Sequence, residues 1–233
     1  MDRRKNEAVV RSFFERAREF NTKLVASLLE EENAATAVMD EAAGIFERMI
    51  PDMAYLETPE MPMAANVFVC NASLAVYLAL TARGVDAHAY GRAMLAEMAR
   101  SPAPDPSAEK RKDTRTREEQ FADFMSSAAS SQKQPKPGEF IYEVFLGDKD
   151  NFDWGMNVES CAICSSFSKY DAMDLVPYMC ASDDVMSDQR KQGLRRTGTI
   201  ALGAHHCDFR YKTGGEPQHI AEEYPERIRL TVI

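Results

Sequence analysis

The segment "GAHHCDFRYK", residues 203–212, concentrates side chains that can take part in chemistry. Two histidines, a cysteine, an aspartate and two cationic residues lie within ten positions, beside aromatic residues at the spacing of a strand. A strand on the surface needs none of these groups, and a buried strand must satisfy every polar group that it hides. The segment therefore predicts either a ligand site or a set of paired charges.

A strand places alternate side chains on opposite faces of its sheet. His206, Asp208 and Arg210 would then share one face, while His205 and Cys207 would share the other. A carboxylate, an imidazole and a guanidinium on one face suit a small zwitterionic or anionic ligand. The structural alternative is that these charges pair with charged neighbours, of which the sequence offers Arg195, Arg196 and Asp184.

The cysteines form a second group with chemical potential, and four of the five fall in the C-terminal half: Cys161, Cys164, Cys180 and Cys207. The first two have the CxxC spacing with which two sulfurs can share one zinc ion. Cys180 and Cys207 are not a close pair, so we expect no metal and no cofactor. A metal site formed by the four thiols remains the alternative. Cys207 cannot use the adjacent His206 as its base, and Asp183 or His205 is the candidate partner.

Composition excludes several classes of partner. The chain has 233 residues, a formal net charge of -9 and 45% hydrophobic residues, as in an ordinary soluble globular protein. The negative balance argues against nucleic acid and against an anionic membrane surface. No continuous apolar run follows the basic N-terminus, so we expect no secretory signal and a cytoplasmic protein with reduced thiols.

Periodicity divides the chain into three regions that we expect to form one integrated domain. Residues 1–100 have helical spacing, and they include an apolar helix at 63–83. This helix could be buried in the core or could form a homodimer interface. Residues 101–138 are a polar linker or insertion with a short helix near 117–129. Residues 139–233 alternate as short strands around one helix at 174–191. The predicted fold class is α+β: a helical N-terminal half, then a small antiparallel sheet with a covering helix.

Finer predictions concern the elements of this third region. Its strands are expected in five segments: "EFIYEVFLG", "FDWGMNV", "LRRTGTIAL", "HHCDFRYK" and the tail "RIRLTVI". Asp174 is expected to cap the helix, with Pro177 in its first turn.

Three motifs in order carry a resemblance to a known family. They are "FDWGMNVESCAI", "DLVPYMCASDDVMS" and "LRRTGTIALGAHHCDFRYK". Together they resemble the L-2-amino-thiazoline-4-carboxylic acid hydrolase family, over roughly residues 150–212. The positions that match the family pattern are Gly155, Asn157, Val158, Cys161, Cys180, Asp183, Arg196, Thr197, Thr199, Gly203, Ala204, Cys207, Asp208, Phe209, Arg210 and Tyr211. The ordered combination is more specific than any one motif.

The resemblance implies hydrolytic ring opening of a cyclic isothiourea amino acid to a carbamoylated cysteine. Such a reaction needs a nucleophile at the amidine carbon and a proton donor to the departing nitrogen or sulfur. Residue chemistry then suggests roles at the matched positions. Cys207 or Cys180 is the candidate nucleophile, and Asp183 or Asp208 is the candidate general acid or base. The candidate substrate-binding residues are Arg210 as a carboxylate clamp, Asn157 at the amidine, His206, Arg196 and Thr197.

Two departures from the family pattern keep other functions open. Cys164 and the insertion at 101–138 are not part of that pattern, and the insertion could carry a lid or mark a specialised branch. One alternative is a non-hydrolytic cyclase or isomerase of natural-product biosynthesis that uses the same pocket. The other is a binding domain that senses a small molecule, a metal or redox state through its thiols.

Overall fold

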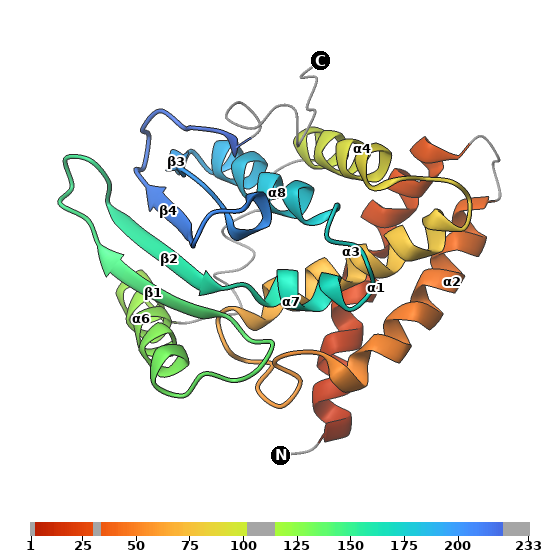
Figure 1. The fold of residues 1–233 in the computed structure, drawn as a ribbon, viewed down its shortest axis with the longest axis horizontal. Coiled ribbons are helices and arrows are strands. Elements are labelled where there is room, and N and C mark those ends of the chain that lie inside the picture. The colour runs from red at the N-terminus through yellow and green to blue at the C-terminus, as the bar shows by residue number, and fades with distance from the viewer. Residues whose placement is uncertain (1–2, 30–33, 102–114, 221–233) are drawn as a thin grey trace.

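The structure is a computed structural model, and it describes residues 3–29, 34–101 and 115–220. Figure 1 shows a helical half on one side and a small sheet on the other, so the predicted α+β class is confirmed. The helices are α1 Arg3–Leu28, α2 Ala34–Met49, α3 Ala64–Thr81, α4 Ala87–Arg100, α6 Arg117–Lys133, α7 Ala162–Ser168 and α8 Val176–Gln189. The strands are β1 Ile141–Leu146, β2 Trp154–Ser160, β3 Leu194–Arg195 and β4 Cys207–Tyr211.

The apolar helix α3 is the centre of the helical half. It packs against α1 and α2 on one side and α7 on the other. Among the described helices it is the one long and apolar enough to cross a membrane, but 61% of its most apolar stretch is buried inside the fold. That burial is the behaviour of a core helix.

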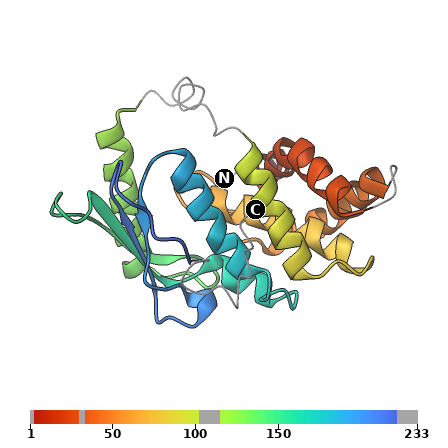
Figure 2. The same cartoon turned by 90° about the horizontal axis from the view of Figure 1, so that it is seen from above.

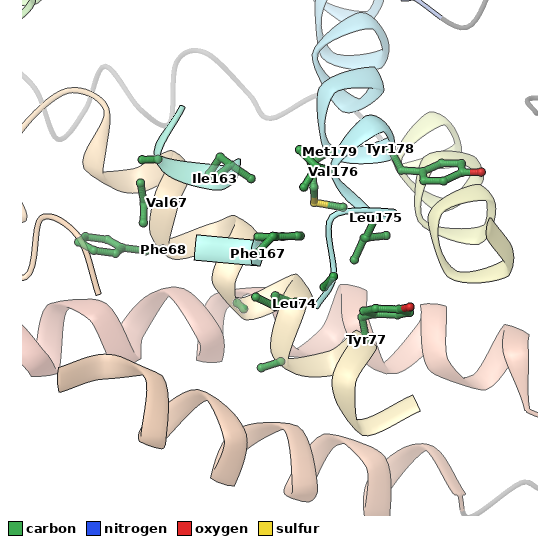
Figure 3. Close-up of a cluster of buried hydrophobic side chains, with 14 of the residues drawn as sticks. Val67, Phe68, Leu74, Tyr77, Ile163, Phe167, Leu175, Val176, Tyr178 and Met179 are labelled. Carbon is green, nitrogen blue, oxygen red and sulfur yellow. The ribbon is translucent and has the colours of Figure 1, made fainter. Parts of the chain in front are cut away.

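Aromatic and aliphatic side chains lock α3, α7 and α8 together. Figure 3 shows Phe167 of α7 lying between α3 and the start of α8, close to Leu74 and Leu175. Phe167 and Leu175 are completely buried. Truncation of a Phe in such a position typically costs about 3–5 kcal/mol. This cluster fixes α8 relative to the helical half.

The sheet is antiparallel with strand order β1-β2-β4-β3. In its centre Met156 faces Phe209, and Val158 faces Cys207. Residues opposite each other on antiparallel strands share a face, so these four form an inner face. Asn157 with Asp208, and Gly155 with Arg210, form the outer face. The two faces predicted for Cys207 and Asp208 are therefore confirmed.

Helices α6 and α8 both pack on the inner face (Figure 2). Phe124 of α6 lies against Tyr142 of β1, at 5.5 Å between ring centroids, and against Trp154 of β2. The short helix predicted at 117–129 is thus confirmed. It begins with a capping box in which Thr116 and Glu119 exchange side-chain and backbone hydrogen bonds. The polar segment ahead of it, at 102–114, lies outside the described residues.

Three details of the C-terminal region differ from the sequence prediction. The strand expected over "LRRTGTIAL" stops after Leu194–Arg195, because Asp208 takes the backbone N–H groups that follow, and a 3₁₀ turn forms at Ile200–Leu202. The strand expected over "HHCDFRYK" begins only at Cys207, because Gly203 has φ of 95° and turns the chain before it. Helix α8 starts after Leu175 without a side-chain cap, so the cap expected at Asp174 is wrong.

Other details follow the prediction. Strands β1 and β2 form the expected hairpin, and Pro177 lies in the first turn of α8. The tail "RIRLTVI" lies outside the described residues. The division at 100 and 138 stays a prediction, although Gln189 of α8 donates hydrogen bonds to the carbonyls of Met98 and Ser101 and so joins the first and third regions.

Candidate active site

The most deeply buried charge in the described structure is the guanidinium of Arg196, whose side chain has no exposed surface. It lies just after β3 and points at α8. It donates to Asp183 Oδ2 at 3.0 Å, to Asp184 Oδ1 at 2.6 Å and to the carbonyl of Cys180 at 2.9 Å. Its Cζ also lies 4.9 Å from the centroid of the Phe209 ring. A buried charge needs such partners, because desolvation otherwise costs several kcal/mol.

Asp183 and Asp184 share this one cation but have different surroundings. Asp184 is buried, and its second oxygen accepts the backbone N–H of Ile220 at 3.0 Å. The side chain of Asp183 keeps 34% of its surface exposed. Asp184 therefore anchors the guanidinium and the chain at Ile220, while Asp183 remains accessible to a ligand.

The accessible carboxyl is also the one with a strongly raised pKa. Burial among the surrounding elements raises the pKa of Asp183 to about 6, against the opposing pull of Arg196, and the neighbouring Asp184 adds to the rise. Two carboxylates beside one guanidinium leave one negative charge in excess, which favours protonation. A carboxyl with a pKa near 6 can accept and return a proton at neutral pH.

Three thiols, those of Cys70, Cys180 and Cys207, lie near this carboxyl, and the thiol of Cys161 lies near those three. Cys180 lies one turn before Asp183 on α8, Cys207 begins β4 on the inner face, Cys161 precedes α7, and Cys70 belongs to α3. Asp183 and Cys161 are both close enough to Cys70 to contribute to its raised pKa. The site is thus assembled where the helical half meets the sheet.

None of these four thiols is held as a thiolate. Burial raises the pKa of Cys207 to about 11 and that of Cys180 well above its usual range. Interaction with the Cys164 thiol and burial raise the pKa of Cys161. Reactive cysteines instead need an electropositive environment that lowers the pKa. The thiols are protonated at neutral pH in this arrangement.

Asp208 makes structural contacts on the other side of the strand. Its carboxylate accepts from the backbone N–H groups of Thr197 and Gly198, and from Thr197 Oγ1 at 2.8 Å. It thereby holds the loop that delivers Arg196 to α8. The structure brings Asp208 and Thr197 together, but through contacts that fix the loop.

Arg210 and Asn157 lie on the outer face of the sheet. Arg210 donates to Asn157 Oδ1 at 2.9 Å, and Asn157 donates to Glu143 Oε1 at 2.5 Å. The Arg210 guanidinium lies over the rings of Phe145 and Phe152, at 4.9 and 5.5 Å. The structure does not bring these two residues to Asp183, because they belong to the opposite face.

His205 and His206 lie in the bend before β4, and both are exposed. They do not alternate between the two faces of the sheet, because the strand starts after them. Of the residues predicted for the site, the structure gathers four on the inner side: Cys180, Asp183, Arg196 and Cys207.

Neither a cluster of metal ligands nor a recess of the described surface coincides with this arrangement. Within residues 3–29, 34–101 and 115–220, no group of three or more His, Cys, Asp or Glu side chains is placed to hold a metal ion. Two recesses of about 450 and 480 Å³ lie on another part of the surface, and they share the residues Asp52, Met53, Ser166 and Lys169. Neither recess is lined by a residue predicted for the site.

Sequence reasoning missed two members of the site: Asp184 as an anchor, and Cys70. The Asp-Asp pair at 183–184 was a usable signal, because adjacent acids on a buried helix require a cation. Cys70 lies about 110 residues before Asp183, in a helix whose pattern indicates only core packing. Its position beside the site depends on how α3 packs, which no local pattern predicts.

Comparison with known proteins agrees with this C-terminal assembly. The family described as L-2-amino-thiazoline-4-carboxylic acid hydrolase matches residues 60–211, a range that includes α3, α8, the sheet and every residue of the Asp183 site. Neither a curated protein nor a solved structure matches the chain significantly. Because the match spans more than half of the 233 residues, the chain belongs to the L-2-amino-thiazoline-4-carboxylic acid hydrolase family.

Proposed function

We propose that this protein is a hydrolase that opens a small polar heterocycle, with Asp183 as the group that activates water. The natural test substrate is L-2-amino-thiazoline-4-carboxylic acid, which the family description names. The observation that carries the proposal is an accessible carboxyl that burial holds at a pKa of about 6, beside a fully buried arginine. Perturbed carboxyls of this kind are typical of catalytic sites.

The reaction follows from the chemistry of the amidine carbon between the ring nitrogen and sulfur. The ionised Asp183 takes a proton from water as the water oxygen bonds to that carbon. The tetrahedral adduct then collapses: the bond from this carbon to the ring nitrogen breaks, and the adduct hydroxyl becomes a carbonyl. The departing nitrogen takes two protons, the one held by Asp183 and the one released by that hydroxyl. The products retain every atom of the substrate and of one water molecule.

Attack by Cys180 or Cys207 has less support. With a pKa of about 11 for Cys207, roughly one molecule in 10⁴ carries the thiolate at neutral pH. Covalent catalysis needs a base or cation that activates the thiol, and the one guanidinium beside these thiols is bonded to two carboxylates. We therefore assign the thiols to the wall of the site.

The experiment is an assay of wild type and Asp183→Asn with the thiazoline substrate, followed by mass spectrometry of the product. We expect kcat to fall by about 10² to 10⁴-fold, the usual contribution of a general base. Asp174→Asn is the matched control, since Asp174 is an exposed carboxylate two residues before α8, and it should retain wild-type turnover. Full activity of Asp183→Asn would refute the assignment.

A companion measurement separates hydrolysis from cyclisation or isomerisation. In water enriched in ¹⁸O, hydrolysis places one labelled oxygen in the product, whereas a cyclase or isomerase places none. A product without label would favour the non-hydrolytic alternative at the same site. Binding without any turnover would favour the sensing alternative.

Location and assembly belong to the same proposal. We propose a cytoplasmic location, since an odd number of cysteines fits reduced thiols better than a disulfide framework. We expect a small-molecule substrate and no nucleic-acid or membrane partner, on the charge argument given above. Size-exclusion chromatography with light scattering would test for a homodimer.

A further inference from the structure

Tyr211, the last residue of β4, is held between two other aromatic rings. Its ring stacks on that of Trp154, with centroids 4.2 Å apart and planes 13° apart. On β4 itself the Phe209 ring lies parallel to it at 6.3 Å. Trp154 is supported in turn by Phe121 and Phe124 of α6, in edge contacts at 6.0 and 6.2 Å. Because these rings flank the phenol, its hydroxyl is the part left free to meet a ligand.

The same strand places the Tyr211 ring on the face of the sheet that carries the Asp183 site. Tyr211, Phe209 and Cys207 alternate along β4 and so share the inner face. Phe209 lies beneath the guanidinium of Arg196, and Arg196 bonds Asp183. Burial raises the pKa of Tyr211 well above its usual range, and the charge of Asp183 adds to that rise, so the phenol keeps its proton at every pH of interest.

The phenol is also available for an interaction. Tyr211 is only partly buried, and its hydroxyl makes no hydrogen bond to any other described residue. The Tyr211 hydroxyl is thus a hydrogen-bond donor that is held in place by its ring and has no acceptor among the described residues. A rigid donor of this kind, aimed where charge develops, is the usual means by which proteins stabilise a transition state.

We propose that the hydroxyl of Tyr211 is a second catalytic group of the site, which donates a hydrogen bond to the ring heteroatom that gathers negative charge as the ring opens. Tyr211 keeps its proton throughout, and the two protons that reach the leaving nitrogen come from Asp183 and from the hydroxyl of the adduct. This inference rests on the proposed hydrolytic function. It assigns the stacked aromatic rings the task of holding that donor in place.

The test is Tyr211→Phe, which preserves the stacked ring and removes only the hydroxyl. We expect kcat to fall about 10² to 10³-fold, the usual effect of removing one such donor, while KM changes less than about threefold. The chain has a single tryptophan, Trp154, which touches this ring. Its emission spectrum therefore reports whether the stack survives, and we expect the spectrum and the thermal midpoint to match wild type.

Tyr77→Phe is the matched control. Tyr77 is a buried tyrosine of α3 that packs against Tyr90, and it should retain wild-type kcat. Wild-type kcat in Tyr211→Phe would overturn the role of the hydroxyl and leave the proposed function standing. An inactive wild-type enzyme would instead refute the proposed function, and this inference with it.

A second variant tests the role of the hydroxyl even if Tyr211→Phe fails to fold. Site-specific incorporation of 3-fluorotyrosine at position 211 keeps the shape and makes the hydroxyl more acidic. A change in kcat at 211, with no change for the same replacement at 77, would support the inference. A kcat indifferent to the replacement at 211 would overturn it.

Discussion

The two faces of β4 carry similar residue types in very different situations. On the outer face Arg210, Asn157 and Glu143 form a chain of hydrogen bonds beside solvent. On the inner face Arg196 meets two carboxylates with no exposed surface of its own. Each polar group outside has a neighbour or water, while the inner carboxylates must share one cation. Burial raises the pKa of both inner carboxyls against the opposing pull of Arg196, and at Asp183 the neighbouring Asp184 charge adds to the rise.

The two aspartates of α8 differ in burial and in the number of hydrogen bonds that they accept. Asp184 is buried and bonded on both oxygens, to the guanidinium and to the backbone of Ile220. Asp183 makes one of these contacts and retains exposed surface. One carboxylate therefore contributes to stability, and its neighbour is left free for chemistry.

The largest expected effect on stability comes from Asp184→Ala. The variant leaves Arg196 with one carboxylate and leaves a backbone N–H without its acceptor, so we expect a loss of about 3–5 kcal/mol in the free energy of unfolding. Urea unfolding at neutral pH measures it. Asp183→Asn is the comparison, and should lose no more than about 1 kcal/mol because that side chain is partly exposed and the amide can still accept. Equal losses in the two variants would remove the distinction between the aspartates.

A smaller effect is expected from the thiols. Cys180→Ser and Cys207→Ser should retain kcat within about tenfold, since burial keeps both pKa values raised and neither thiol is a resting nucleophile. Steady-state assays measure the change, and alkylation mapped by mass spectrometry at pH 7 should show slow reaction at both positions. Loss of turnover by three orders of magnitude in either variant would return the nucleophile to cysteine.

The smallest effect is expected on the outer face. Arg210→Ala removes the hydrogen bonds that Nη1 donates to Asn157 Oδ1 and to the carbonyls of Phe209 and Met156, and the contacts with two phenyl rings. Because the three acceptors share one nitrogen, we expect about 0.5–1 kcal/mol of lost stability. Turnover and KM should stay within about twofold, because Arg210 lies on the face away from Asp183. A large rise in KM with unchanged kcat would show that the outer arginine does bind the substrate carboxylate.

Sequence periodicity predicted the helices, the hairpin and the alternation along β4. It could not predict which face of β4 would be covered, because that depends on where α6 and α8 pack. The outward Arg210 was therefore predicted as a ligand clamp on chemistry alone. The histidines were misplaced for a local reason: the Gly203 turn delays the strand to Cys207.

Arg196 is a second case in which the sequence could not predict what a side chain contacts. Its position in the family pattern made Arg196 a candidate site residue. Its contacts with α8, however, depend on a loop whose backbone N–H groups bond to Asp208. Those bonds also end the strand that was expected there. Long-range contacts of this kind have no signature in the spacing of one segment.

The measurement that tests the central claim most directly is the dependence of kcat/KM on pH for thiazoline hydrolysis. A general base must be ionised, so activity should be full above the pKa of Asp183 and lost as pH falls through it. We expect kcat/KM to be level near pH 7 to 8 and to fall tenfold per pH unit below about 6. A profile that is flat through pH 6, or one that rises only toward the range of a thiol, would contradict the assignment of Asp183.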